Sequence, residues 1–244
     1  MSSAANVNKL NVIDQNIAYY NEVAVTYNSI IDSDETNGIV RQKVKDNFLA
    51  LIKSGTVLDF GGGTGLDLEW LAAANYKIYF CEPSDAMRNQ AINYYNSKSP
   101  GANVVFLDEH QTDFRKWPST SPFPTKFDGI LSNFGVINYI PGISGLFQSL
   151  AGVIKPGGHF VGIMLNLDLR KRLKWHRRNA IRSLFLRESF KMYIPYKEHK
   201  QAIFVHTASE VKKASAPYFT YVPCESLKAF DFTLIHLVRN EKPC

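Results

Sequence analysis

The chain has 244 residues, of which 45% are hydrophobic and 20% charged, and its formal net charge is +6. These values suit a soluble globular protein and exclude no enzyme class, but the cysteines are informative. Cys81, Cys224 and Cys244 form no CxxC pair, which argues against a disulfide framework and a structural zinc site. Because no apolar run reaches the ~20 residues that span a bilayer and residues 1–11 do not resemble a signal peptide, we expect a cytoplasmic protein.

The first part of the chain, residues 1–55, is predicted to be helical. Apolar and aromatic residues recur at helical spacing over residues 17–27 and again over residues 39–52. The second helix is expected to end at the Lys-Ser-Gly of residues 53–55, because Gly55 tolerates a left-handed C-terminal position.

Strands and helices then alternate. Short apolar strands are predicted for residues 56–60, 77–81, 103–107, 127–132 and 159–165, with helices over 66–74, 84–95 and 143–153. A Lys-Pro-Gly-Gly turn at 155–158 is expected to precede the fifth strand. Strands separated by helices of this length predict a mostly parallel, doubly wound α/β sheet.

The pattern breaks after residue 165. Residues 166–200 contain eleven basic and three acidic residues, a net charge of +8, whereas the rest of the chain has a net charge of −2. A basic amphipathic helix or helix pair is predicted for 168–190. The apolar side of this helix is predicted to comprise Leu169, Leu173, Ala180, Ile181, Leu184 and Phe185. Residues 193–205 are aromatic-rich and predict no clear element. A helix over 209–216 and strands over 218–222 and 232–238 complete the prediction.

The sequence DFGGGTG at 59–65 lies between a predicted strand and a predicted helix, where a ligand-binding glycine loop is expected. Glycines let the backbone turn sharply and approach a ligand closely. The GxGxxG dinucleotide pattern does not fit, because Leu66 and Leu68 stand where its last glycine would be. A P-loop is excluded, because no Gly-Lys-Ser/Thr follows.

This loop resembles motif I of the class I S-adenosylmethionine-dependent methyltransferases. The resemblance implies that the loop binds the methionine part of the cofactor and that Glu82, at the end of the next strand, holds the ribose hydroxyls. Pro83 follows Glu82, and Met87 is implied to pack on the adenine. The cofactor-binding residues expected from the loop itself are Asp59, Gly61, Gly62, Gly63 and Gly65.

Other positions match the family less closely. His110 and Gln111 fall where the family usually has an acidic adenine contact, in a departure from its Gly-Asp pattern. Asn133 follows the strand that faces the methyl group and either caps that strand or lines the cofactor. Tyr27 stands in a segment similar to the lid helix of small-molecule methyltransferases, and is either a lid or a core aromatic.

The resemblance implies a Rossmann-like, doubly wound, mostly parallel seven-stranded sheet. It divides the chain into an N-terminal helical lid (1–55), a core that binds S-adenosylmethionine (56–165), an inserted helical and basic substrate cap after the fifth strand (166–205), and a final helix and strand pair (206–244). No catalytic dyad is recognisable, and we expect no metal because the carboxylates lack metal-ligand spacing.

The expected activity is methyl transfer from S-adenosylmethionine, with S-adenosylhomocysteine as product, to an oxygen or nitrogen atom of a small-molecule or natural-product acceptor in biosynthesis. The basic cap favours an acceptor with an anionic group. One alternative is a methyltransferase of RNA or of a peptide or protein, which the same basic segment would suit. Nucleic acid is the less favoured partner, because the remaining surface is slightly acidic. The other alternative is a non-catalytic module that binds the cofactor.

Overall fold

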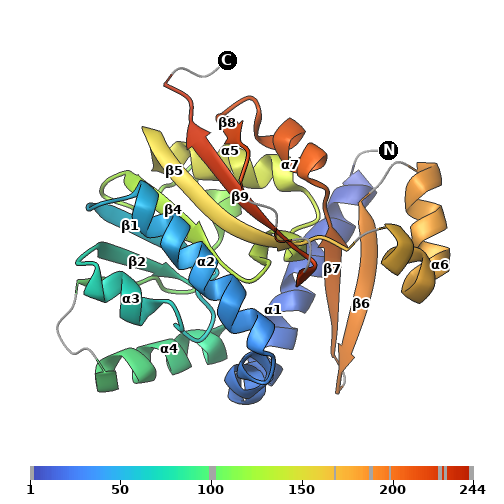
Figure 1. The fold of residues 1–244 in the computed structure, drawn as a ribbon, viewed down its shortest axis with the longest axis horizontal. Coiled ribbons are helices and arrows are strands. Elements are labelled where there is room, and N and C mark those ends of the chain that lie inside the picture. Colours follow the sequence, from blue (N-terminus) through green and yellow to red (C-terminus); the bar gives the residue numbers. More distant parts are fainter. Residues whose placement is uncertain are drawn as a thin grey trace.

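The computed structural model describes residues 3–98, 103–167, 169–186, 189–197, 199–224, 227 and 230–241. Its centre is a seven-stranded sheet in the order β3-β2-β1-β4-β5-β9-β8 (Figure 1). The first five strands are parallel, and β9 runs antiparallel between β5 and β8. The predicted Rossmann-like sheet is therefore confirmed. The strands are β1 (Thr56–Phe60), β2 (Lys77–Cys81), β3 (Val104–Phe106), β4 (Phe127–Ser132), β5 (Ile154–Leu165), β8 (Phe219–Val222) and β9 (Phe232–Arg239).

Helices cover both faces of the sheet. Phe48 of α2 is fully buried in a core cluster with side chains of α3, α4 and the sheet. Phe147 of α5 is fully buried in a second cluster, which includes α7. These two clusters account for the doubly wound arrangement, because each face of the sheet buries its own apolar layer. The helices are α1 (Ser3–Asp32), α2 (Glu35–Leu51), α3 (Leu68–Ala73), α4 (Asp85–Lys98), α5 (Ile143–Val153) and α7 (Ala208–Ser215), with 3₁₀ turns η1 (Phe114–Lys116) and η2 (Val136–Tyr139).

α1 and β5 differ most from their predicted bounds. α1 is one helix of 30 residues, much longer than the apolar stretch at 17–27. β5 begins at Ile154, before the predicted turn, because Ile154 pairs with Phe127 while the register with β4 shifts further along. The Lys155 ammonium lies 2.6 Å from the Asp128 carboxylate, which fixes the turn against β4.

The insertion contains more than the predicted helical cap. α6 (Leu169–Leu186) is followed by an antiparallel hairpin of β6 (Phe190–Tyr196) and β7 (His199–Val205). The helix therefore ends before the predicted residue 190, since Phe190 already pairs with Val205. On the predicted apolar side of α6, Ala180 is buried, whereas Leu173 and Ile181 are 37% and 39% exposed. The side chains of Leu169, Leu184 and Phe185 lie outside the described part of the structure.

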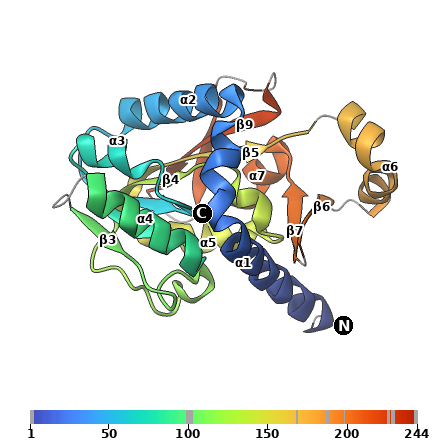
Figure 2. The same cartoon turned by 90° about the horizontal axis from the view of Figure 1, so that it is seen from below.

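Hydrogen bonds connect the hairpin to the N-terminal helix. The Asn16 side chain accepts from the Ala202 amide at 2.7 Å and donates to the Ala202 carbonyl at 3.0 Å. The Gln201 amide donates to the Tyr20 hydroxyl at 2.6 Å. In both views α6 lies beyond this hairpin, at the edge of the molecule (Figures 1 and 2). None of the described helices is both long enough and apolar enough to cross a membrane.

Candidate active site

The glycine loop after β1 depends on backbone conformations that favour glycine. Gly61, Gly63 and Gly65 have φ angles of +76°, +59° and +81°, in the region that L residues with a Cβ rarely adopt. The amides of Gly61 and Gly62 donate to the carbonyl of Cys81 at 2.7 and 3.3 Å. These hydrogen bonds hold the loop against the end of β2. The helix predicted to start at residue 66 begins at Leu68.

The glycines of the loop differ in how much room a side chain would have. A Cβ at Gly62 would lie 2.2 Å from the Phe80 ring, and one at Gly65 would lie 2.9 Å from a side chain of α4. At Gly63 the nearest atom would be 3.9 Å away, in the Tyr27 ring. Packing thus excludes side chains at Gly62 and Gly65, whereas Gly63 faces open space, as a loop that cradles a ligand would.

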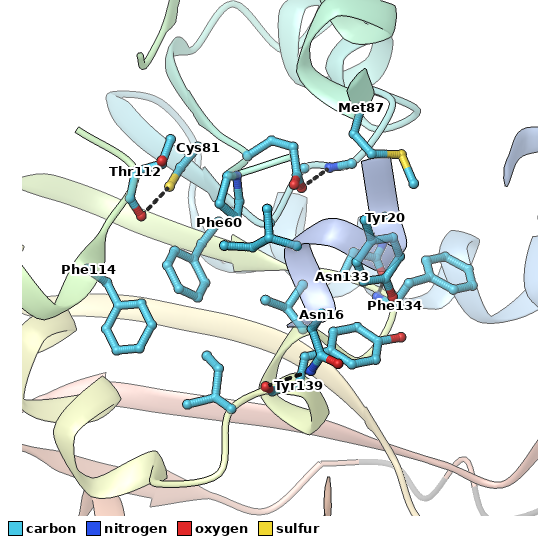
Figure 3. A pocket seen from close by; sticks show the side chains of 18 of the residues that line it. Asn16, Tyr20, Phe60, Cys81, Met87, Thr112, Phe114, Asn133, Phe134 and Tyr139 are labelled. Carbon is cyan, nitrogen blue, oxygen red and sulfur yellow. Dashed lines mark hydrogen bonds between the residues drawn. The ribbon is translucent and has the colours of Figure 1, made fainter. Parts of the chain in front are cut away.

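A cavity of about 260 Å³ opens beside this loop. Figure 3 shows Tyr20, Tyr139 and Asn16 on one side of it, and Phe60 and Phe114 on the other. The lining residues come from α1, α2, the glycine loop, the end of β2, η1 and η2: Ile13, Asn16, Ile17, Tyr20, Tyr27, Arg41, Phe60, Gly61, Gly62, Gly63, Thr64, Leu66, Asp67, Cys81, Glu82, Pro83, Met87, Glu109, Thr112, Asp113, Phe114, Arg115, Lys116, Asn133, Phe134, Val136, Tyr139 and Ile140.

Glu82 lines the cavity at the carboxyl end of β2. Its carboxylate accepts hydrogen bonds from the amide of Gly63 at 3.0 Å and from the amide of Ser84 at 2.8 Å. Burial raises the pKa of Glu82 to about 7, although these two hydrogen bonds and the Arg88 charge oppose the rise. Since a carboxylate has about four acceptor sites, Glu82 can still accept hydrogen bonds from hydroxyl groups in the cavity.

Asp59, at the acidic position of the motif, lies behind the loop. Its side chain is buried, and within the described part of the chain its Oδ2 atom has no hydrogen-bond partner. Burial raises the pKa of Asp59 well above its usual range, and the neighbouring Asp67 adds to the rise. A Cβ at Gly62 would come within 2.6 Å of Oδ2, so the Asp59 carboxyl group packs directly beneath the glycine loop.

Asp67 holds three parts of the fold together beside the cavity. Its carboxylate pairs with Arg41 of α2 at 2.8 Å and accepts from the side-chain amide of Asn133 at 3.0 Å. The Trp70 indole donates to it at 2.9 Å, and the Arg41 guanidinium lies 4.5 Å from the centre of the Phe134 ring. Our sequence analysis did not identify Arg41 or Asp67. The position of Asp67, two residues after Gly65, could have identified it, whereas no nearby pattern in the sequence marks Arg41.

Tyrosines form the wall of the cavity on the side of α1. The Tyr20 ring packs edge-to-face on Tyr27 and on Tyr139, with ring centres 6.1 and 5.3 Å apart. The Gln201 amide donates to the Tyr20 hydroxyl, so the hairpin supports this wall from behind. Burial raises the pKa of both Tyr20 and Tyr139 above the ordinary value. The phenols therefore stay protonated at neutral pH.

Most of the predicted cofactor-binding residues line this one cavity: Tyr27, Gly61, Gly62, Gly63, Glu82, Pro83, Met87 and Asn133. Asn133 borders the cavity and also accepts from the amide of Phe134 at 3.0 Å, after the end of β4, so its contact with the cofactor stays a prediction. Asp59 and Gly65 lie behind the loop and are not among the lining residues.

The predicted adenine contacts lie outside the lining. The His110 side chain is 82% exposed, and the Gln111 carbonyl accepts from the Trp117 indole at 2.8 Å. Their neighbours Glu109 and Thr112 do border the cavity. The adenine contact remains a prediction for this segment.

The predicted substrate cap does not contribute directly to the cavity. Over the described parts of 166–205, no residue belongs to the lining. Ala202 and Gln201 instead bond to Asn16 and Tyr20, which do line it. The cap's contact with an acceptor therefore remains a prediction. In the described residues, no three His, Cys, Asp or Glu side chains are grouped so as to hold a metal ion.

Comparison with known proteins supports the interpretation of the site. A family model described as a methyltransferase domain matches residues 35–214. A methyltransferase from Bacillus velezensis, itself uncharacterized, is 31% identical over 121 residues, which cover 48% of this chain and 52% of that protein. The chain thus spans about half the length of this curated relative.

Solved structures share the fold at low sequence identity. DhpI in a complex with SAM and HEP is 15% identical, with a TM-score of 0.67 over 93% of this chain and 97% of DhpI. Magnesium protoporphyrin IX methyltransferase (ChlM) from Synechocystis PCC 6803, with bound SAH, is 16% identical, with a TM-score of 0.52 over 84% of this chain and 82% of that one. At these identities the similarity concerns the fold.

Proposed function

Since the chain belongs to the class I S-adenosylmethionine-dependent methyltransferases, with S-adenosylmethionine as its cofactor, we propose that it methylates an oxygen or nitrogen atom of a small-molecule or natural-product acceptor. The observation that supports this proposal is the composition of the cavity lining. The glycine loop and Glu82 border the same cavity as apolar side chains of α1 and η2. S-adenosylhomocysteine would be the other product.

The cofactor would occupy the part of the cavity beside the glycine loop. There Glu82 would accept hydrogen bonds from the ribose hydroxyls, the open side of Gly63 would admit the cofactor, and Met87 would pack on its base. Arg41, held by Asp67, is available to a carboxylate group. The bound cofactor supplies an electrophilic methyl group on a sulfonium ion.

The acceptor would occupy the apolar part of the cavity. Ile13 and Ile17 of α1, Phe114 of η1 and Ile140 supply apolar side chains to that part of the lining. These side chains would exclude water and hold the acceptor's nucleophile against the methyl group, which is the main requirement of an in-line displacement.

The lining favours acceptors that need no proton removed. No histidine occurs among the described lining residues, and Tyr20 and Tyr139 have raised pKa values. A carboxylate oxygen or a neutral amine is already nucleophilic near neutral pH, whereas an alcohol needs a general base. A carboxylate would also be the anionic group expected from the sequence. Arg115 and Lys116 border the cavity and would attract it, although Arg115 also pairs with Asp113 at 2.6 Å.

A methyltransferase of RNA or of a peptide or protein is the second candidate. The observation that favours it is α6, whose sequence holds seven basic residues and no acidic one. A macromolecular acceptor would have to reach from this surface into a cavity to which the described residues of α6 do not contribute. We therefore prefer a small acceptor, and propose a role in small-molecule biosynthesis in the cytoplasm.

The test is transfer of radiolabelled methyl from S-adenosylmethionine into a fractionated extract of the source organism. We expect label in the small-molecule fraction, and we expect Glu82→Ala to remove it. Label confined to the RNA or protein fraction would overturn the proposal in favour of the second candidate. Wild-type protein that binds the cofactor yet labels no fraction would contradict both.

A further inference from the structure

The outward face of α6 is strongly basic. Between Leu169 and Leu186 the helix has seven Lys or Arg residues and no acid. Arg170, Lys174 and Arg177 follow one another at i, i+4 and i+7, a spacing that places them on the same face of a helix. These residues and the adjacent Arg178 are all exposed.

Exposed apolar side chains lie among these charges. Ile181 continues the same face, four residues after Arg177, and is 39% exposed. Leu173 of α6 and Tyr193 and Ile194 of β6 are also exposed. Among the described residues, eight large hydrophobic side chains are exposed, and these four belong to the insertion.

The position of α6 leaves this face accessible. Ala180 packs in a small cluster with Phe190 and Val205 of the hairpin, which attaches one side of the helix to the fold. Figures 1 and 2 both show α6 at the edge of the molecule, with the hairpin between it and the sheet. The face that carries Arg177 and Ile181 lies about a quarter of a turn from Ala180 and is exposed, so it can meet a flat surface.

We propose that this basic face, formed by Arg170, Lys174, Arg177, Arg178 and Ile181 with Leu173 at its edge, docks on the surface of a bilayer that contains anionic lipids. The charges complement the negative headgroups, and the cytoplasmic leaflet presents such headgroups to a cytoplasmic protein. Amphipathic helices with basic residues around apolar ones bind in this way, parallel to the surface.

The apolar side chains distinguish a membrane from a nucleic acid. Both partners attract Lys and Arg through phosphate groups. Burial of Leu173 and Ile181 stabilises binding only where they can leave water, and the acyl boundary of a bilayer offers that environment whereas a phosphate backbone does not. Exposed Tyr193, on the neighbouring hairpin, is a residue type enriched at membrane interfaces.

The test is flotation of the full chain with vesicles of phosphatidylcholine alone and of phosphatidylcholine mixed with phosphatidylglycerol. We expect binding to the anionic vesicles that weakens as salt is added. Each basic residue near such a surface strengthens binding by about fivefold, so Arg177→Glu with Arg178→Glu should weaken it by more than about twentyfold. Leu173→Ser with Ile181→Ser should weaken binding to the same vesicles by several-fold.

The control variant is Lys212→Glu with Lys213→Glu, which makes the same change of charge on exposed positions of α7 and should leave vesicle binding unchanged. Thermal unfolding of each variant establishes that it is folded. Equal binding to both kinds of vesicle, or equal loss in the two charge-reversal variants, would overturn the proposal. So would binding of an RNA oligonucleotide by this face without binding to vesicles. Because vesicle binding needs no methyl transfer, this result is independent of the proposed activity.

Discussion

The core at 56–165 and the insertion at 166–205 use their polar residues in opposite ways. In the core, the acidic residues of the motif, Asp59 and Glu82, are buried, and Glu82 accepts a hydrogen bond from the glycine loop. In the insertion, Arg170, Lys174, Arg177 and Arg178 of α6 are exposed, and so are the apolar side chains of Leu173 and Ile181. Polar residues of the core thus line or support a cavity, whereas those of the insertion lie on an exterior surface. Each substitution below tests whether the two regions act independently.

The largest effect is expected when a substitution adds a single methyl group to the glycine loop of the core. Gly62→Ala would place a Cβ 2.2 Å from the Phe80 ring. We expect a loss of about 1–3 kcal/mol of unfolding free energy, as for other overpacked cores, together with loss of cofactor binding. Urea unfolding measures the first effect and calorimetric titration with S-adenosylhomocysteine the second. Gly145→Ala is the control, because a Cβ at this position in α5 meets nothing within 4 Å. Equal stability of the two variants would contradict the packing argument.

The second-largest effect is expected from removal of the Glu82 carboxylate. Glu82→Ala removes the acceptor proposed for two ribose hydroxyls, and hydrogen bonds to a charged group stabilise a complex by about 1.5–3 kcal/mol each. Affinity for S-adenosylhomocysteine should therefore fall by roughly 100-fold or more. Glu69→Ala, an exposed acid on α3, should leave it unchanged. A titration in which both variants bind like the wild type would exclude Glu82 as the ribose contact.

The connection between the two regions can be cut at Asn16. Its side chain bonds to both backbone groups of Ala202 and donates to the Tyr139 carbonyl at 3.2 Å. Asn16→Ala leaves buried groups without partners, so we expect a loss of about 1–3 kcal/mol in unfolding free energy. Asn89→Ala, at an exposed position of α4, is the control. If both variants unfold at the same urea concentration as the wild type, the hairpin is not held through Asn16.

The pH dependence of cofactor binding tests the buried charge in the core. With its pKa raised to about 7, Glu82 is mostly protonated below that pH, and a protonated carboxyl cannot accept from both hydroxyls. Affinity for S-adenosylhomocysteine should thus rise as the pH increases through 7, by up to about tenfold per pH unit on the acidic side. Glu82→Gln should remove this dependence. A variant that keeps the wild-type pH profile would assign the titration to another group.

The smallest effect is expected in the insertion. Replacement of Arg177 and Arg178 with Ala changes exposed positions outside the cavity, so unfolding free energy should change by no more than about 0.5 kcal/mol. The dissociation constant for S-adenosylhomocysteine should not change. A clear loss of cofactor affinity would contradict the separation of the two regions. A rise in the acceptor's KM is the result that the predicted substrate cap requires.

The same separation explains what the sequence could predict. The glycine loop was predicted because glycines after a strand allow a positive φ and a close approach, and the resemblance to the family then implied Glu82 at the end of the next strand, where it borders the same cavity. Arg41 was missed because its pairing with Asp67 joins residues 26 positions apart, and no short pattern marks it.

The insertion was harder to predict for another reason. Residues 193–205 gave no clear element, although β6 and β7 pair there in a regular hairpin, because their aromatic residues do not alternate with polar ones. Periodicity correctly indicated a helix at α6 and grouped Leu173 and Ile181 with Ala180 on its apolar side, although of these three only Ala180 is buried. Period alone does not tell whether a partner covers an apolar side chain.

The most direct test of the central claim is a crystal structure of the chain with S-adenosylhomocysteine. We predict the product in the cavity beside Gly63, with both ribose hydroxyls within hydrogen-bond distance of the Glu82 carboxylate. A product bound elsewhere, or a ribose that turns away from Glu82, would contradict the account.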